Sequence, residues 1–129
     1  MNEFMTKEYI ELAKDKRRQG LRPKIQMYDY ISPVENPNPE RAIADWTDDL
    51  DFFINRERDN YIFLPDSDFL DAEIARLCKG DWTYYFIYDI ADNAYYAEIK
   101  ESYRHVYSFN SDNPLIAKIL LLIKLLEGE

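Results

Sequence analysis

The amino-acid sequence predicts an α+β fold, with an antiparallel sheet packed by helices in a single domain over residues 1–129. Three observations predict this class. Segments typical of strands follow one another between residues 81 and 109, and helical patterns stand on both sides of them. The composition, with 47% hydrophobic residues and three glycines, is that of a globular chain. The expected order of elements is αβαβαβββα.

Helical and strand patterns alternate in the first half of the chain. Residues 6–19 predict a helix that Thr6 caps, because its acidic residues lie early and its basic residues lie late. Alternating apolar and polar residues predict a half-buried strand at 24–31. Apolar residues at three- and four-residue spacing then predict an amphipathic helix from Asn38-Pro39 to about residue 57, with an acidic outer face.

The next segments predict a short strand and two further helices. Residues 61–65 form an apolar strand that a proline closes, and the helix after it takes Asp66, Ser67 or Asp68 as its cap. The last helix starts after residue 113 and is apolar almost all round. Two interpretations of this terminal helix stay open: it lies at the centre of the core, or its second face meets another subunit.

Aromatic residues are concentrated between residues 81 and 99. A two-residue turn at Asp92-Asn93 predicts a hairpin in which Tyr88 pairs with Ala97. That register assigns one set of side chains to the core, namely Trp82, Tyr84, Phe86, Tyr88, Ile90, Tyr95 and Ile99. Tyr85 and Tyr96 fall on the other face, which suits contacts with a protein if no helix covers it.

The charge of the chain is strongly negative. Sixteen Lys and Arg stand against twenty-five Asp and Glu, so the formal net charge is −9. This balance disfavours direct nucleic-acid binding and anionic membranes, and it favours a protein partner with a basic surface. No apolar leader follows the first Met, and the longest apolar run, Ile119–Ile123, is far shorter than a membrane span. We therefore expect a cytoplasmic protein.

No motif in the sequence predicts catalysis. Phosphate-binding glycine loops are absent, and the single cysteine, Cys78, supports neither a disulfide framework nor a zinc site. His105, the single histidine, is expected on a strand at 103–109, on the side of Tyr103, Tyr107 and Phe109, as a packed or partly exposed side chain rather than a general base. The prediction is a protein that is not an enzyme and that needs no cofactor.

Two segments of the second half resemble proteins of one kind. "NYIFLPDSDFLDAEIARL" and "YSFNSDNPLIAKILLLIKLLEG", together with the hairpin between them, cover roughly residues 60–128. They are similar to segments of small tailed-phage and prophage accessory proteins of unassigned function. The resemblance implies a mobile-element origin, a location in the host cytoplasm, and a small accessory or anti-defence protein that acts by binding.

Carboxylates are the abundant functional groups, and they support the leading hypothesis. The acidic helix at 40–57 and the turn at 66–73 are expected to dock on a basic surface, such as the nucleic-acid channel of a defence nuclease, by imitating nucleic-acid charge. The residues assigned to partner binding are Asp45, Asp48, Asp49, Asp51, Asp66, Asp68, Tyr85 and Tyr96.

Two other hypotheses stay open beside it. One is a structural homo-oligomer, such as a homodimer that forms through the terminal helix and the exposed face of the sheet. The other is a small metal- or ligand-binding protein that uses Asp45, Asp48 and Asp49, which share one helical face. Without a metal or ligand, these three carboxylates form an ordinary solvated face.

Overall fold

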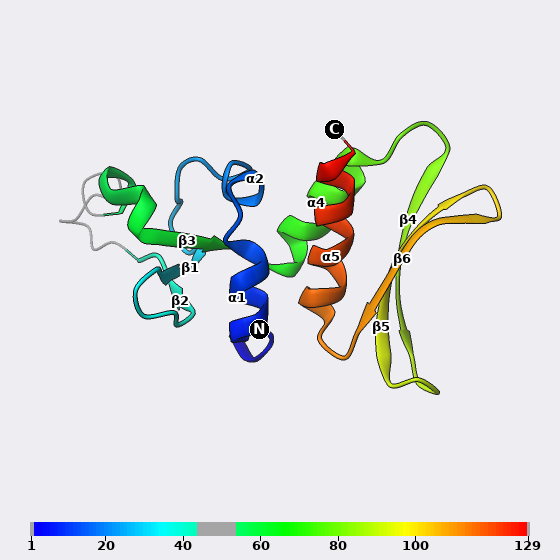
Figure 1. The fold of residues 1–129 in the computed structure, drawn as a ribbon, viewed down its shortest axis with the longest axis horizontal. Coiled ribbons are helices and arrows are strands. Elements are labelled where there is room, and N and C mark those ends of the chain that lie inside the picture. The colour runs from blue at the N-terminus through cyan, green and yellow to red at the C-terminus, as the bar shows by residue number, and fades with distance from the viewer. Residues whose placement is uncertain (1, 44–53, 129) are drawn as a thin grey trace. The chain divides into compact units, whose positions relative to one another are not determined.

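The computed structural model describes residues 2–43 and 54–128. Residue contacts divide the chain into two compact units, Met1–Asp66 and Ser67–Glu129, and each unit is described by itself. Both contain helices and a three-stranded antiparallel sheet (Figure 1), which confirms the α+β class. That residues 1–129 form a single domain stays a prediction.

The first unit opens with short helical segments, η1 (Asn2–Phe4), α1 (Lys7–Ala13) and α2 (Lys16–Gln19). The predicted cap is confirmed, since Thr6 accepts a hydrogen bond from the Tyr9 amide. The predicted continuous helix at 6–19 is wrong. Asp15 leaves the helical region with ψ 143°, and its carboxylate caps α2 by accepting from the Arg17 amide at 2.8 Å.

The sheet of the first unit is built from short strands in the order β2-β1-β3. These are β1 (Tyr30–Pro33), β2 (Glu40–Arg41) and β3 (Tyr61–Leu64), with the 3-10 segment η2 (Asn55–Asn60) before β3. Beneath β3 lies the buried face of α1, where the hydroxyl of the fully buried Tyr9 donates to the carbonyl of Pro65 at 2.5 Å.

Two predictions for this unit are wrong. The strand expected at 24–31 begins only at Tyr30, because Tyr28 adopts the left-handed φ of 69° and interrupts the extended chain. The helix expected from residue 39 does not start there, because the backbone of Glu40–Arg41 pairs with β1 instead. The middle of that expected helix, residues 44–53, lies outside the described residues.

The second unit contains α4 (Ser67–Leu77), β4 (Trp82–Asp89), β5 (Ala94–Glu101), β6 (Arg104–Ser111) and α5 (Pro114–Glu127). The three strands form the predicted meander in the order β4-β5-β6. Asn113 caps α5 by accepting from the amides of Leu115 and Ile116, and Pro114 fits the first position of the helix. Leu121 and Leu125 of α5 are 0% and 5% exposed, so the terminal helix is buried on most sides.

The β4–β5 hairpin forms with a register that differs by two residues from the predicted one. Tyr88 pairs with Tyr95, and the turn contains the four residues from Ile90 to Asn93, of which Asn93 has φ 51°. Because side chains alternate with a period of two, this shift leaves every residue on its predicted face. Tyr85 and Tyr96 therefore share a face, as expected.

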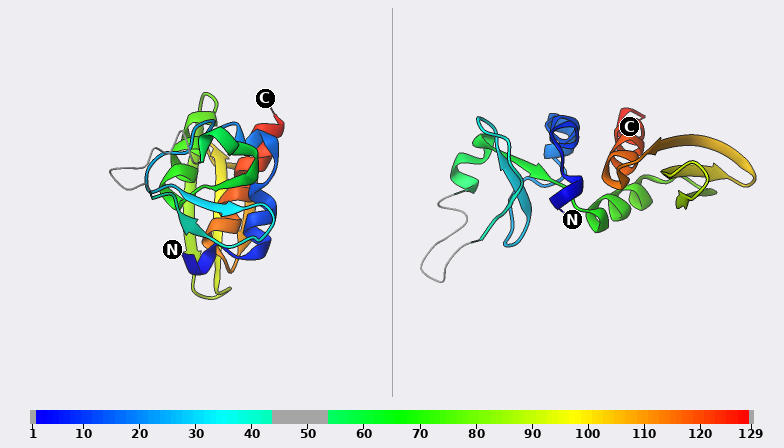
Figure 2. Two further views of the ribbon diagram at one scale, coloured as in Figure 1. Left: turned by 90° about the vertical axis from the view of Figure 1, so that its left-hand side faces the viewer. Right: turned by 90° about the horizontal axis from the view of Figure 1, so that it is seen from below.

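One face of this sheet is covered by the helices of its own unit. Figures 1 and 2 show α4 and α5 on the same side of the strands, and α5 packs on β5 and β6, where Ala97 and Ile99 are fully buried. Within residues 67–128, no helix lies on the opposite face. None of the helices in the described ranges has the length and apolarity that crossing a bilayer requires.

The assignment of Phe86, Tyr88 and Ile90 to the core is wrong. Their exposed fractions are 37%, 44% and 84%. Strand β4 is at the edge of the sheet, beside β5, while α5 packs on β5 and β6, and Ile90 lies in the turn instead of the ladder. The other side chains of that predicted set are buried or half-buried.

Candidate functional site

The edge strand β4 exposes apolar side chains along most of its length. Tyr85, Phe86, Ile87, Tyr88 and the turn residue Ile90 are all between 37% and 84% exposed, and we call these five residues the β4 patch. Tyr85 and Ile87 lie on the sheet face opposite the helices, whereas Phe86 and Tyr88 lie on the helix side. The patch therefore presents apolar surface on both faces of one strand.

Carboxylates border the β4 patch at the turn of the hairpin. Asp89 is half-buried and Asp92 is exposed. The hydroxyl of Tyr96 donates to Asp92 at 2.6 Å, and this hydrogen bond raises the pKa of Tyr96. Strand β4 itself carries no charge from Trp82 to Tyr88. The result is a neutral apolar strip with a negative end.

An ion pair between the buried Lys118 and the partly exposed Asp71 supports this strand from the helix side. The ammonium of Lys118, which is 4% exposed, lies 2.9 Å from Asp71 and 2.6 Å from the Ser67 hydroxyl. Tyr84 donates to the same carboxylate at 2.8 Å, and burial, more than this bond, raises the pKa of its hydroxyl. Lys118 also lies 4.1 Å from the ring centre of Phe86. Because Lys118 donates to Ser67 and is neutralised by Asp71, the cluster holds α4, α5 and β4 together and does not activate the serine.

The first unit contains a concave surface, made of two adjoining pockets. The larger has a volume of about 600 Å³ and is lined by three cationic side chains, those of Lys14, Lys16 and Arg58. The smaller, of about 400 Å³, is lined by the carboxylates of Glu35, Glu40 and Glu57. Val34, Asp59 and Tyr61 line both pockets. We call the larger one the basic pocket and the smaller one the acidic pocket.

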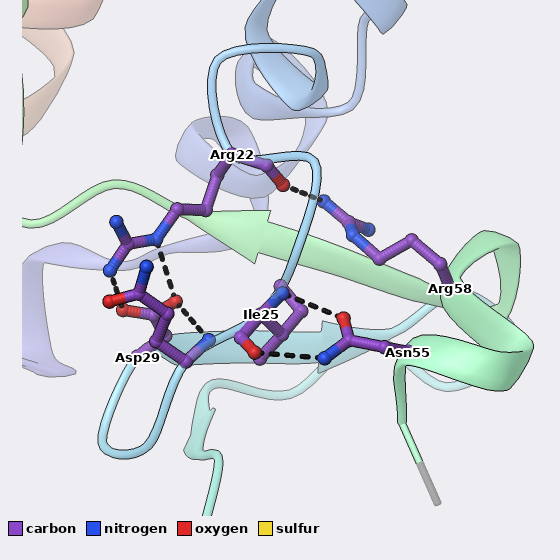
Figure 3. Close-up of polar contacts among 6 residues, drawn as sticks. Arg22, Ile25, Asp29, Asn55 and Arg58 are labelled. Carbon is purple, nitrogen blue, oxygen red and sulfur yellow. Dashed lines mark hydrogen bonds and ion pairs between the residues drawn. The ribbon is translucent and has the colours of Figure 1, made fainter. Parts of the chain in front are cut away.

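Hydrogen bonds from side chains to backbone shape the wall of the basic pocket. Arg58 donates to the carbonyl of Arg22 at 3.2 Å (Figure 3), and also to the carbonyl of Tyr61 at 2.7 Å and to the side-chain oxygen of Gln19 at 2.9 Å. Its Nε is buried without a hydrogen-bond partner. Burial lowers the pKa of Arg58 from its ordinary value, against the opposing effect of Asp59 and Asp29.

Two further polar contacts fix the loop that carries this wall. Arg22 binds both carboxylate oxygens of Asp29, at 2.9 Å and 2.7 Å, and the hydrogen bonds with Asp29 raise the pKa of Arg22. Asn55 pairs with both the amide and the carbonyl of Ile25, at 2.7 Å and 2.9 Å, in place of a neighbouring strand (Figure 3). These contacts determine the path of the chain between α2 and β1.

Of the residues predicted to bind a partner, half lie within the described part of the chain. Asp45, Asp48, Asp49 and Asp51 lie outside it. Asp66 directly precedes α4 and is half-buried, while Asp68 is exposed in the first turn. Tyr85 is 43% exposed and has Lys100 5.1 Å from its ring centre, whereas Tyr96 is half-buried. The structure therefore groups Tyr85 and Tyr96 on one surface of the second unit.

The predicted placement of His105 is wrong. A register shift near Ile99 and Lys100 places His105 opposite Lys100, so it lies on the face of Glu98 instead of the face of Tyr107 and Phe109. Its side chain is 56% exposed, and Nδ1 lies 3.9 Å from the Glu98 carboxylate. The only described cysteine, Cys78, is half-buried, and burial raises the pKa of its thiol. Neither group has the surroundings of an activated nucleophile or base.

Comparisons with protein-family models, with curated proteins and with solved structures found no match to this chain. Over residues 2–43 and 54–128, no group of three or more His, Cys, Asp or Glu is arranged to hold a metal ion. The β4 patch and the two pockets of the first unit are therefore the candidate binding surfaces of the described residues.

Proposed function

We propose that this chain acts by binding another protein, without catalysis, and that the β4 patch is its contact surface. The observation that carries this proposal is the exposure of Tyr85, Phe86, Ile87, Tyr88 and Ile90 along one edge strand. Contiguous exposed apolar surface is uncommon on monomers, and tyrosine and phenylalanine are enriched where proteins meet. The polar cluster of Lys118, Asp71 and Tyr84 holds the strand in place before a partner arrives.

The partner has an apolar cleft bordered by Lys or Arg. Asp89 and Asp92 flank the patch, and the net charge of −9 attracts a basic surface over longer distances. A nucleic acid fits less well, because stacking of bases on exposed rings needs a cationic track beside them. Of the two described cations beside these rings, Lys118 is paired with Asp71, and Lys100 at Tyr85 stands against Asp89 and Asp92. Imitation of nucleic-acid charge by Asp45, Asp48, Asp49 and Asp51 stays a prediction, because those residues lie outside the described ranges.

The homodimer alternative has less support from α5. Its apolar residues beyond the usual stripe, Leu121 and Leu125, are 0% and 5% exposed. The described part of the terminal helix thus offers a second copy little apolar surface, whereas the β4 patch offers much more.

Affinity capture with quantitative mass spectrometry tests the proposal. The double variant Ile87→Lys/Ile90→Lys places charges in the β4 patch at exposed positions, and Ile43→Lys is the matched control, since Ile43 is 66% exposed in the other unit. We expect at least one protein to be retained by the wild type and the control and lost by the double variant. Its retention should fall as salt rises from about 0.05 M to 0.5 M. The same proteins retained by all three chains would contradict the proposal.

A further inference from the structure

We propose that the basic pocket of the first unit binds an organic anion, in which one carboxylate or phosphate group is carried on a compact apolar body. The site is independent of the protein contact proposed for the β4 patch. Its volume of about 600 Å³ suits a small molecule, and its lining combines cationic and apolar side chains.

Positive charge is concentrated in the basic pocket. Three cations, Lys14, Lys16 and Arg58, and one carboxylate, Asp59, line the pocket, so its described lining is net positive in a chain whose net charge is −9. Lys14 pairs only with the exposed Glu11, at 3.1 Å, and such a pair is weak in water. Within the described ranges, Lys16 has no ion-pair partner. Two of the three cations are therefore available to a ligand.

The hydrogen-bond partners of the Arg58 guanidinium also favour an anionic ligand. All its hydrogen bonds go to uncharged oxygens, those of Tyr61, Gln19 and Arg22, and its Nε is buried without a partner. A half-buried guanidinium without a carboxylate on it is costly, and a buried polar atom without a partner is rare. Asp59 is the one carboxylate among the described residues that line the pocket, so three cations face a single anion, and an anionic ligand supplies further opposite charge.

The remaining lining determines the rest of the ligand. Pro23, Val34 and Ile62 give the basic pocket an apolar wall, and Val34 is 38% exposed. On the far side of Val34 and Tyr61 lie the carboxylates of the acidic pocket. They repel a second anionic group, so the ligand carries its charge at one end and an apolar or cationic group at the other. Polyphosphates and nucleic acids are excluded by the same repulsion.

Four probes measured by ¹⁵N–¹H NMR titration of the full chain test this site. Benzoate and phenyl phosphate carry the two anionic groups on one apolar body, benzyl alcohol lacks the charge, and inorganic phosphate lacks the apolar body. We expect one or both aromatic anions to shift the amides of Lys16, Tyr61 and Ile62 with saturation at millimolar concentration, and the anion that binds more tightly identifies the group. Benzyl alcohol and inorganic phosphate should bind at least about tenfold more weakly, which corresponds to about 1.4 kcal/mol.

Single charge reversals locate the contact. Lys16→Glu removes a cation from the pocket without touching the framework of Arg58, and Lys7→Glu makes the same change at an exposed position of α1 that does not line the pocket. We expect Lys16→Glu to raise the Kd of the better anion about tenfold and Lys7→Glu to change it less than about twofold. The double variant of the β4 patch should bind the anion like the wild type.

Three outcomes would overturn the proposal. One is that neither aromatic anion shifts those amides by about 20 mM. Another is that Lys7→Glu weakens binding as much as Lys16→Glu, which would indicate a general field effect. The third is that benzyl alcohol binds as tightly as benzoate and phenyl phosphate, which would show an apolar site without anion recognition.

Discussion

The two units of this chain satisfy the hydrogen-bonding groups of their backbones in different ways. In the second unit, long regular strands and helices pair the backbone groups with one another around an apolar core. In the first unit the regular elements are short, and side chains such as those of Gln19, Asn55 and Arg58 pair with the backbone instead. Backbone amides and carbonyls must find partners in either case. The comparison shows that one chain can be held by periodic burial in one half and by specific polar contacts in the other.

This difference also separates the two proposed sites. The β4 patch is what remains exposed on an edge strand that the helices of its unit cover only in part. The basic pocket is lined by α2, η2, β3 and the loop before β1, and Arg22, Asp29 and Asn55 hold that loop in place. The first suits a large partner that covers a surface, and the second suits a small one that enters a cavity.

The largest expected effect tests the apolar core of the second unit. Leu122 is fully buried in α5, so Leu122→Ala removes buried methyl groups and leaves a cavity. We expect the free energy of unfolding to fall by about 3–4 kcal/mol, measured by urea denaturation. Lys124→Ala on the same helix is the control, because Lys124 is exposed and its pairing with Glu127 at 4.0 Å is weak. A loss below about 1 kcal/mol for Leu122→Ala would mean that this core does not hold the unit together.

The corresponding test in the first unit replaces a polar side chain. Gln19 donates to the carbonyls of Ala13 and Phe63, and accepts from the Phe63 amide at 2.7 Å and from Arg58. Gln19→Leu is similar in size but leaves these groups without partners, so we expect a loss of about 2–3 kcal/mol in the same urea assay. Gln26→Leu, at an exposed position, should change stability by less than about 0.5 kcal/mol. Equal effects of the two variants would contradict the view that specific polar contacts hold this unit.

High pH is expected to destabilise the chain through one tyrosine of each unit. Burial raises the pKa of Tyr9 and of Tyr84 above the ordinary value of about 10. Above that value the unfolded chain loses the two protons while the folded chain keeps them, so the stability present below about pH 10 falls as the pH rises. We expect a loss of about 1 kcal/mol for each of these tyrosines between about pH 10 and pH 11, from urea denaturation at several pH values.

Two variants attribute this pH dependence to its source. Tyr9→Phe lowers stability at neutral pH, because the hydrogen bond to Pro65 is lost, but it should flatten the slope above about pH 10. Tyr103→Phe should leave the slope unchanged, since Tyr103 is fully exposed and has similar surroundings in the folded and unfolded chain. An unchanged slope in Tyr9→Phe would contradict the assignment.

The sequence predicts the regular elements of the second unit better than the polar contacts of the first. Hydrophobic periodicity identified α4, the meander and α5, and it placed Tyr85 and Tyr96 on one face, because burial there repeats with the period of the element. It misplaced the strand at 24–31, where alternation continues through Tyr28 although the backbone turns at that residue. The hydrogen bonds of Asn55 with Ile25 join positions thirty residues apart, and no local sequence pattern predicts them.

The candidate sites, too, could be predicted only as far as side-chain burial repeats along the sequence. Alternation assigns Phe86 and Tyr88 to the helix side of the sheet, which is correct, but it does not reveal that α5 packs on β5 and β6 and leaves the edge strand exposed. The basic pocket could not be predicted, because only the tertiary fold brings Arg58 to Lys14 and Lys16, which lie more than forty residues earlier in the sequence. The charge balance of the whole chain even points away from a cationic site.

The smallest expected effect concerns a polar contact inside the regular unit. Asn113 caps α5, with Oδ1 2.9 Å from the Leu115 amide, so Asn113→Ala leaves donors of the first turn without a partner. We expect a loss of about 1 kcal/mol by urea denaturation, largely restored in Asn113→Ser because serine is also a good cap, while Asn110→Ala at an exposed position is neutral. This loss should be smaller than that of Gln19→Leu, because a cap joins neighbours in sequence whereas Gln19 joins α2 to β3 across forty-four residues. If the cap variant cost more, polar contacts would hold the second unit as strongly as the first, and the distinction between the units would fail.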